Sequence, residues 1–148
     1  MPSHGTPHAA DSLGNPLTLD DAASLALVDD FVMGFLSTEA RAVNLLALAE
    51  RDASPIVQAY CATLHLFAES RDAASNARPF LERAQAGAAR TSSREQRYIA
   101  AVAAWADGDI GRAIALHQEQ AREHPRDLAS LKLGQYHCFN TGDCPGML

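Results

Sequence analysis

A glycine–aspartate step occurs at Gly108-Asp109 and again 34 positions later, at Gly142-Asp143. Glycine readily takes the left-handed backbone conformation that ends many helices. Two further features recur at the same interval, a large aromatic residue and a residue able to cap a helix: Trp105 with Phe139, and Ser93 with Asp127. A turn, an aromatic residue and a cap at fixed spacing predict a repeated unit of two helices joined by a short turn.

The rest of the chain shows the same alternation of helix starts, apolar faces and polar turns. Ser54-Pro55 combines a capping residue with proline at the first helical position. The stretch before Tyr98 offers two overlapping capping boxes: Ser92 with Glu95, and Ser93 with Gln96. A helix that begins after Ser37 or Thr38 is predicted to bury Val43, Leu46 and Ala47. About seven helices are expected in total.

Composition favours an all-α fold, because 47% of the residues are hydrophobic and much of that share is alanine. The 34-residue interval is the length of a tetratricopeptide (TPR) hairpin, and such hairpins stack into an α-solenoid. An ordinary helical bundle that contains a chance pair of Gly-Asp turns is the alternative. Residues 1–17 are polar and contain three prolines. They are predicted to form a flexible arm ahead of a TPR-like domain over residues 18–148.

The charge pattern narrows the classes of partner. The formal net charge is −6, and no stretch is rich in lysine and arginine, which argues against nucleic-acid binding. No apolar run approaches the roughly 18 residues that a membrane span needs. The N-terminal residues do not resemble a secretory signal. Three cysteines without framework spacing indicate reduced thiols, and we expect a cytoplasmic protein.

Motifs for catalysis or metal binding are weak throughout the sequence. Cys61 and His65 lie one helical turn apart, but no third group is evident that would orient them as a nucleophile and base. His117 lacks the second histidine of a zinc-protease helix. Pro2-Ser3-His4 could enclose Cu(II) or Ni(II) if Met1 is removed. We therefore expect no enzyme activity, no cofactor and no metal site in the helical domain.

Several segments of the chain resemble the tetratricopeptide repeat protein 38 family. The segments that carry the resemblance are Gly14-Asn15-Pro16-Leu17-Thr18, Arg94-Glu95-Gln96, Gly108-Asp109, and His124-Pro125-Arg126-Asp127 followed by Leu128 and Leu131. The resemblance covers about residues 11–147 and implies an array of helical hairpins without catalytic residues. Relatives continue with further helices, so we expect a truncated member of the family. Its last repeat would expose an apolar surface or bury it in a dimer.

The concave face of such an array is lined by the first helix of each hairpin. The candidate partner-binding residues on these helices are Tyr98, Trp105, Lys132 and Tyr136. The alternative for Trp105 and Phe139 is packing between repeats. The predicted function is non-catalytic binding of a protein or peptide. The alternative is the N-terminal helical domain of a larger enzyme or ligand-binding protein.

Overall fold

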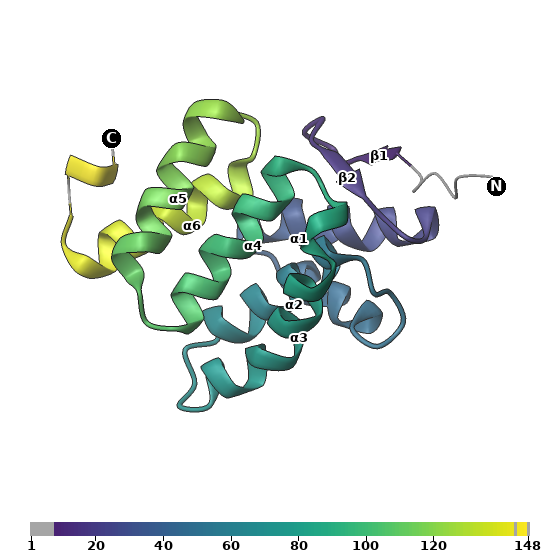
Figure 1. Ribbon diagram of the computed structural model, residues 1–148, viewed down its shortest axis with the longest axis horizontal. Helices are drawn as coiled ribbons and strands as arrows, with labels where there is room; N and C mark the ends of the chain where they lie inside the picture. Colours follow the sequence, from purple (N-terminus) through teal and green to yellow (C-terminus); the bar gives the residue numbers. More distant parts are fainter. Residues whose placement is uncertain (1–7, 144, 148) are drawn as a thin grey trace.

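A computed structural model describes residues 8–143 and 145–147 of the chain. A short β-hairpin precedes a series of helices that pack against one another (Figure 1). The predicted all-α class is confirmed, because helices make up most of the described residues. The elements are, in order, β1 (His8–Ala10), β2 (Pro16–Thr18), the 3-10 helix η1 (Ala22–Ser24), α1 (Leu25–Ser37), the 3-10 helix η2 (Ala40–Leu48), α2 (Pro55–Phe67), α3 (Ala73–Gly87), the 3-10 helix η3 (Ala88–Arg90), α4 (Ser93–Ala106), α5 (Ile110–Glu123), α6 (Leu128–Thr141) and the 3-10 helix η4 (Pro145–Met147).

Helices that are neighbours in the sequence pack as hairpins: α1 with η2, α2 with α3, and α4 with α5. Consecutive hairpins also touch, because α4 contacts both α2 and α3, and α6 contacts α5. Figure 1 shows α4 between the α2–α3 pair and the α5–α6 pair. Helix α1 also contacts α6. Among the described helices, none combines the length and apolar character needed to cross a membrane.

The first helix of each hairpin ends in the same way, and this helix end occurs four times among the described residues. A residue with left-handed backbone follows each of α1, α2, α4 and α6: Thr38, Glu69, Gly108 and Gly142, with φ of 57°, 54°, 79° and 73°. After three of these helices the next amide donates to a carbonyl five residues earlier, at 2.8 Å each time: Glu39 to Gly34, Asp109 to Ala104, and Asp143 to Cys138. The predicted Gly-Asp turn is therefore confirmed as one form of a common helix end.

The predicted pairing of Ser93 with Asp127 as helix caps 34 positions apart is off by one residue. Ser92, rather than Ser93, caps α4, because its side chain accepts from the Glu95 amide and Glu95 reaches back to the Ser92 backbone. Asp127 caps α6 by accepting from the Ser130 amide at 3.2 Å. The caps therefore lie 35 positions apart, whereas the turns lie 34 apart.

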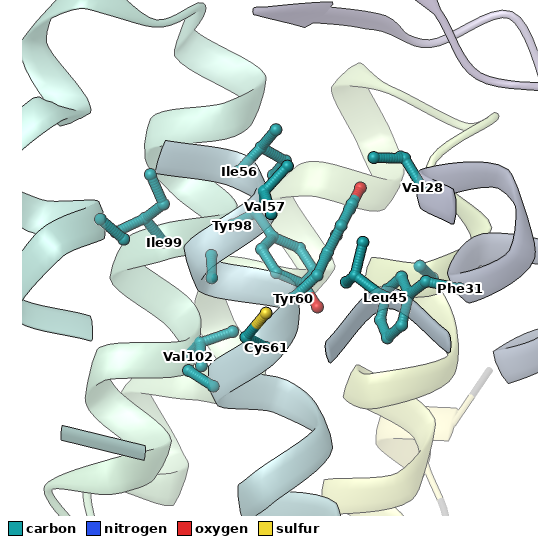
Figure 2. Close-up of a cluster of buried hydrophobic side chains, with 14 of the residues drawn as sticks. Val28, Phe31, Leu45, Ile56, Val57, Tyr60, Cys61, Tyr98, Ile99 and Val102 are labelled. Atoms are coloured by element: carbon teal, nitrogen blue, oxygen red, sulfur yellow. The ribbon is translucent and has the colours of Figure 1, made fainter. Parts of the chain in front are cut away.

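Stacked aromatic side chains join the hairpins at the centre of the protein (Figure 2). The Phe31 ring of α1 stacks on the Tyr60 ring of α2, with centroids 4.4 Å apart. Tyr60 in turn meets the Tyr98 ring of α4 edge to face at 5.1 Å. The Tyr98 hydroxyl lies 2.7 Å from the Thr63 hydroxyl, which satisfies both buried groups. Three hairpins therefore share one hydrophobic core.

The segment after α1 differs from the sequence interpretation. Residues 40–48 form the 3-10 helix η2, which has three residues per turn. Its buried residues are therefore spaced by three, Ala42, Leu45 and Leu48, in place of the predicted Val43, Leu46 and Ala47. Val43 is 53% exposed.

The predicted flexible arm is corrected over residues 8–17. These residues include an antiparallel β-hairpin in which His8 pairs with Thr18 and Ala10 pairs with Pro16. Leu17 is buried against the helices, and Asp11 and Asn15 are buried with it. Residues 1–7, which include the Pro2-Ser3-His4 candidate copper or nickel site, lie outside the described residues. Contacts with residues far away in the sequence hold the hairpin in place. The polar composition of residues 1–17, from which flexibility was predicted, gives no information about such contacts.

Gly34 allows α1 and η2 to approach closely, and we expect Gly34→Ala to destabilise the fold. A Cβ at this position would lie 2.7 Å from the Ala42 backbone nitrogen, which cannot move aside easily. Overpacking of this kind costs about 1–3 kcal/mol of unfolding free energy. Gly111→Ala is the control, because no atom lies within 4 Å of its Cβ position on α5. That change should stabilise the protein by about 0.5–1 kcal/mol in urea unfolding. Equal effects of the two substitutions would contradict the close approach.

Candidate partner-binding face

Two of the four predicted partner-binding residues serve the interior or a helix end. Tyr98 is fully buried in the core, so its side chain offers no surface to a partner. The Lys132 ammonium donates to the carbonyl oxygens of Phe35 and Leu36, the latter at 3.5 Å, and it lies 4.8 Å from the Phe35 ring centroid. A cation at the end of α1 stabilises the unpaired carbonyls and the negative end of the helix dipole. Lys132 therefore fastens α6 to α1.

Tyr136 and Trp105 also form contacts between helices. The Tyr136 hydroxyl bonds to the Glu69 carboxylate, and its ring lies 4.9 Å from the Phe67 ring. Half-buried Trp105 meets the His137 ring at 4.8 Å and the Tyr136 ring at 5.8 Å, so α4 and α6 share an aromatic contact. For Trp105, the structure thus matches the alternative of packing between repeats.

Phe139 behaves differently from Trp105, although the two residues hold equivalent positions. At each of the four helix ends, one residue accepts a hydrogen bond from the left-handed residue three positions later: Phe35, Leu66, Trp105 and Phe139. Phe35 and Leu66 are 5% and 6% exposed, whereas Phe139 is 73% exposed. A position whose large apolar side chain is buried on α1 and α2 and half-buried on α4 therefore faces solvent on α6.

Other apolar and polar groups extend this exposed face of α6. Leu131, Gln135 and Phe139 recur every four residues, so they follow one side of the helix. Leu131 and Gln135 line a pocket of about 480 Å³ where α5, α6 and η4 meet, and Phe139 follows Cys138, another residue of its lining. Its lining includes His117, Gln118, Arg122, Leu131, Cys138 and Met147. We call Leu131, Gln135 and Phe139 together with this pocket the α6 face.

The aspartate in the turn after α6 makes the same hydrogen bond as the aspartate that caps α5. The Asp109 carboxylate accepts from the Arg112 amide at 3.2 Å and caps α5. The Asp143 carboxylate accepts from the Gly146 amide at 3.1 Å, and the 3-10 helix η4 follows. These two caps are 34 positions apart. The repeated geometry places a helical turn beside α6 where α5 begins beside α4.

Two buried histidines lie beneath this face. The His117 Nδ1 atom is 2.7 Å from the Ser130 hydroxyl, and the His117 and His137 rings lie 5.8 Å apart. The Nε2 atoms of both rings are buried and have no hydrogen-bond partner among the described residues. Burial lowers the pKa of His117 to about 3 and that of His137 to about 4, so both rings are neutral at pH 7.

Cys61, weighed as a nucleophile, is buried in the core, and His65, weighed as its base, packs on an aromatic ring. Burial raises the pKa of the Cys61 thiol to about 12, so it is protonated at neutral pH. The His65 ring stacks on the Phe80 ring, with centroids 5.1 Å apart. Within residues 8–143 and 145–147, no group of three or more histidine, cysteine or acidic side chains could hold a metal ion.

Sequence signals could have indicated part of this face. The overlay of Trp105 on Phe139 identifies the aromatic position, but it does not show which of the two rings is covered.

Comparison of the chain with protein-family models, with curated proteins and with solved structures found no match.

Proposed function

We propose that this protein is a non-catalytic, TPR-like binding protein whose partner docks an amphipathic α-helix along the α6 face. The observation that carries the proposal is the 73% exposure of Phe139 at a position where the equivalent residues Phe35 and Leu66 are buried and Trp105 is half-buried. Exposed aromatic residues beside a pocket are frequent anchors of protein interfaces. The TPR-like motifs and the resemblance to the tetratricopeptide repeat protein 38 family support the same class of function.

The internal packing of the chain indicates what shape of ligand suits the α6 face. Trp105, at the position equivalent to Phe139, is covered by side chains of the following first helix, α6. A partner helix at the corresponding place would cover Phe139 in the same way. The four-residue spacing of Leu131, Gln135 and Phe139 matches the side of a helix, as in helix-in-groove recognition. The ligand is therefore a helix with apolar residues spaced by three and four.

Charge adds a second feature to the expected ligand. Arg122 lines the pocket, is exposed, and forms no ion pair within the described part of the chain. An acidic side chain near one end of the partner helix would meet this guanidinium.

The net charge of −6 disfavours a nucleic acid as the ligand. The buried thiols of Cys61 and Cys138 are compatible with a reducing compartment, and we infer a cytoplasmic protein.

The test is a selection of amphipathic helical peptides from a displayed library on the wild-type chain, followed by binding measurements on two variants. Phe139→Ser is expected to weaken the selected peptides by about tenfold or more, because it removes the exposed aromatic anchor of the α6 face. Val43→Ser is the matched control, because Val43 is an exposed apolar residue on η2, away from the α6 face. Its binding should equal that of the wild type.

Two results would contradict the proposal. Peptides that bind Phe139→Ser as tightly as the wild type would place the binding surface elsewhere. Light scattering that shows a dimer of the wild-type chain, which Phe139→Ser dissociates, would mean that a second copy covers the α6 face in place of a partner helix.

A further inference from the structure

The N-terminal β-hairpin and the residues after it, 8–20, lie across the starts of three helices, and we call this segment the strap. Its turn is organised by Asp11, whose carboxylate accepts from the backbone amides of Leu13 and Asn15 at 2.9 Å each. Its main contact on α4 joins Thr18 to Glu95, which are 77 positions apart in the sequence. In Figure 1 the two strands form an extended ribbon beside the helical body.

The main chain of β2 is held by helix side chains along one edge. Arg94 of α4 donates to the Pro16 carbonyl at 2.6 Å. Its neighbour Glu95 accepts from the Thr18 amide at 3.0 Å and from the Thr18 hydroxyl at 2.7 Å. One donor and one acceptor thus pair with backbone groups two residues apart, as a neighbouring strand would. Recognition of backbone groups in this way suits any extended segment with the right spacing.

Side chains of the strap supply the specific part of the contact. Leu17 and Leu19 alternate along the chain, and both are buried, at 2% and 0% exposure. The Asn15 side-chain amide donates to the Arg126 carbonyl at 2.9 Å, just before α6. At the other end, the Asp20 amide donates to the Ser54 hydroxyl at 2.7 Å, at the start of α2. The strap therefore contacts the starts of α2, α4 and α6 together.

Arg94, which holds the Pro16 carbonyl, is itself buried in an ion pair. The Arg94 side chain is 4% exposed and pairs with Asp127 at 2.9 Å. Its Nε atom is buried and has no hydrogen-bond partner among the described residues. A buried donor without an acceptor carries a desolvation penalty.

We propose that Arg94, Glu95, Ser54 and the Arg126 carbonyl form a recognition site for an extended peptide with the pattern Asn-Pro-Leu-Thr-Leu, and that the strap is its resident competitor. The ligand is an extended segment with leucines at alternate positions, a polar residue ahead of them, and backbone groups free along one edge. The site lies at the starts of the helices and is separate from the α6 face.

Displacement of the strap is physically reasonable because little of it is regular structure. The two strands have three residues each, and a short two-stranded hairpin is marginally stable by itself. Ser12 and Gly14 at its tip are exposed. A tethered segment still has an effective concentration of about millimolar, so a free peptide competes poorly with an intact strap. Weakening the strap should therefore uncover binding from solution.

The experiment uses the full chain and a fluorescein-labelled peptide with the sequence of residues 8–21. Leu17→Asp in the chain places a charge on the strap and leaves the recognition site unchanged. We expect the labelled peptide to bind this variant at least tenfold more tightly than the wild-type chain, measured by fluorescence anisotropy. A peptide that carries the same Leu17→Asp change should not bind. Addition of Glu95→Gln to the variant should weaken binding, because the two carboxylate oxygens accept from the Thr18 amide and the Thr18 hydroxyl, and glutamine leaves only one acceptor oxygen.

A chain with both Asn15→Ala and Thr18→Ala serves if Leu17→Asp does not fold, because it weakens the strap without changing the buried leucines. Phe139→Ser in the same background is the matched control and should leave peptide binding unchanged. A folded, strap-weakened chain that does not bind the peptide would overturn the proposal. A wild-type dimer that the peptide converts to monomers would also overturn it, because each strap would then be held by a second copy.

Discussion

Replacement of Asp127 with alanine is expected to lower the free energy of unfolding by about 3–5 kcal/mol, because it leaves the buried Arg94 guanidinium without its counter-ion. The Asp127 carboxylate lies 2.9 Å from Arg94 and 3.0 Å from the Gln120 side-chain amide. Both partners of the ion pair are at most 4% exposed. Urea unfolding followed by circular dichroism measures the loss.

Asp109→Ala separates the ion pair from the capping role of Asp127. Both aspartates accept from the amide three residues later at 3.2 Å, but Asp109 is exposed at the start of α5. Loss of a helix cap alone costs about 1 kcal/mol. If the two variants lose the same stability, the buried ion pair contributes nothing beyond the cap, and the expectation for Asp127 is wrong.

Stability is also expected to fall steeply as the pH is lowered below about 6.5. His117 and His137 are buried, and burial lowers their pKa values to about 3 and 4, from 6.5 for an unperturbed histidine. The unfolded chain therefore takes up protons before the folded chain does. The stabilisation is complete above pH 6.5 and is lost as the pH falls towards these lowered values. Between pH 6.5 and 5 the loss is about 2 kcal/mol for each histidine.

Unfolding free energies measured across this pH range test the effect. His117→Gln and His137→Gln should each remove about half of the pH dependence, whatever they do to stability at pH 7. His124→Gln is the control, because His124 follows α5 and is outside the buried pair. A wild-type slope in both buried-histidine variants would show that other groups cause the acid sensitivity.

The local features of this fold could be predicted because each depends on residues within one or two helical turns. The capping box at Ser92, the cap at Asp127 and the left-handed glycines at 108 and 142 all form from neighbouring backbone groups. The register of η2 could not be predicted in this way. Its three-residue spacing accompanies the close approach of Gly34 to Ala42, which joins separate elements.

The candidate binding residues show the same division. The sequence placed Tyr98, Trp105, Lys132 and Tyr136 on first helices, and the structure confirms that they lie on α4 and α6. Which side of a helix faces a partner depends on the elements that pack against it. The contact between α1 and α6 decided that Lys132 caps α1, although the two groups lie 97 positions apart.

The sequence by itself therefore determined the helical class, the caps and the recurring turn, because short-range hydrogen bonds and helix periodicity encode them. Only the tertiary structure decided that residues 8–17 are ordered, that Tyr98 is buried and that Phe139 is exposed. These outcomes depend on pairs of residues far apart in the chain, such as Thr18 with Glu95, whose meeting is settled by the packing of whole helices.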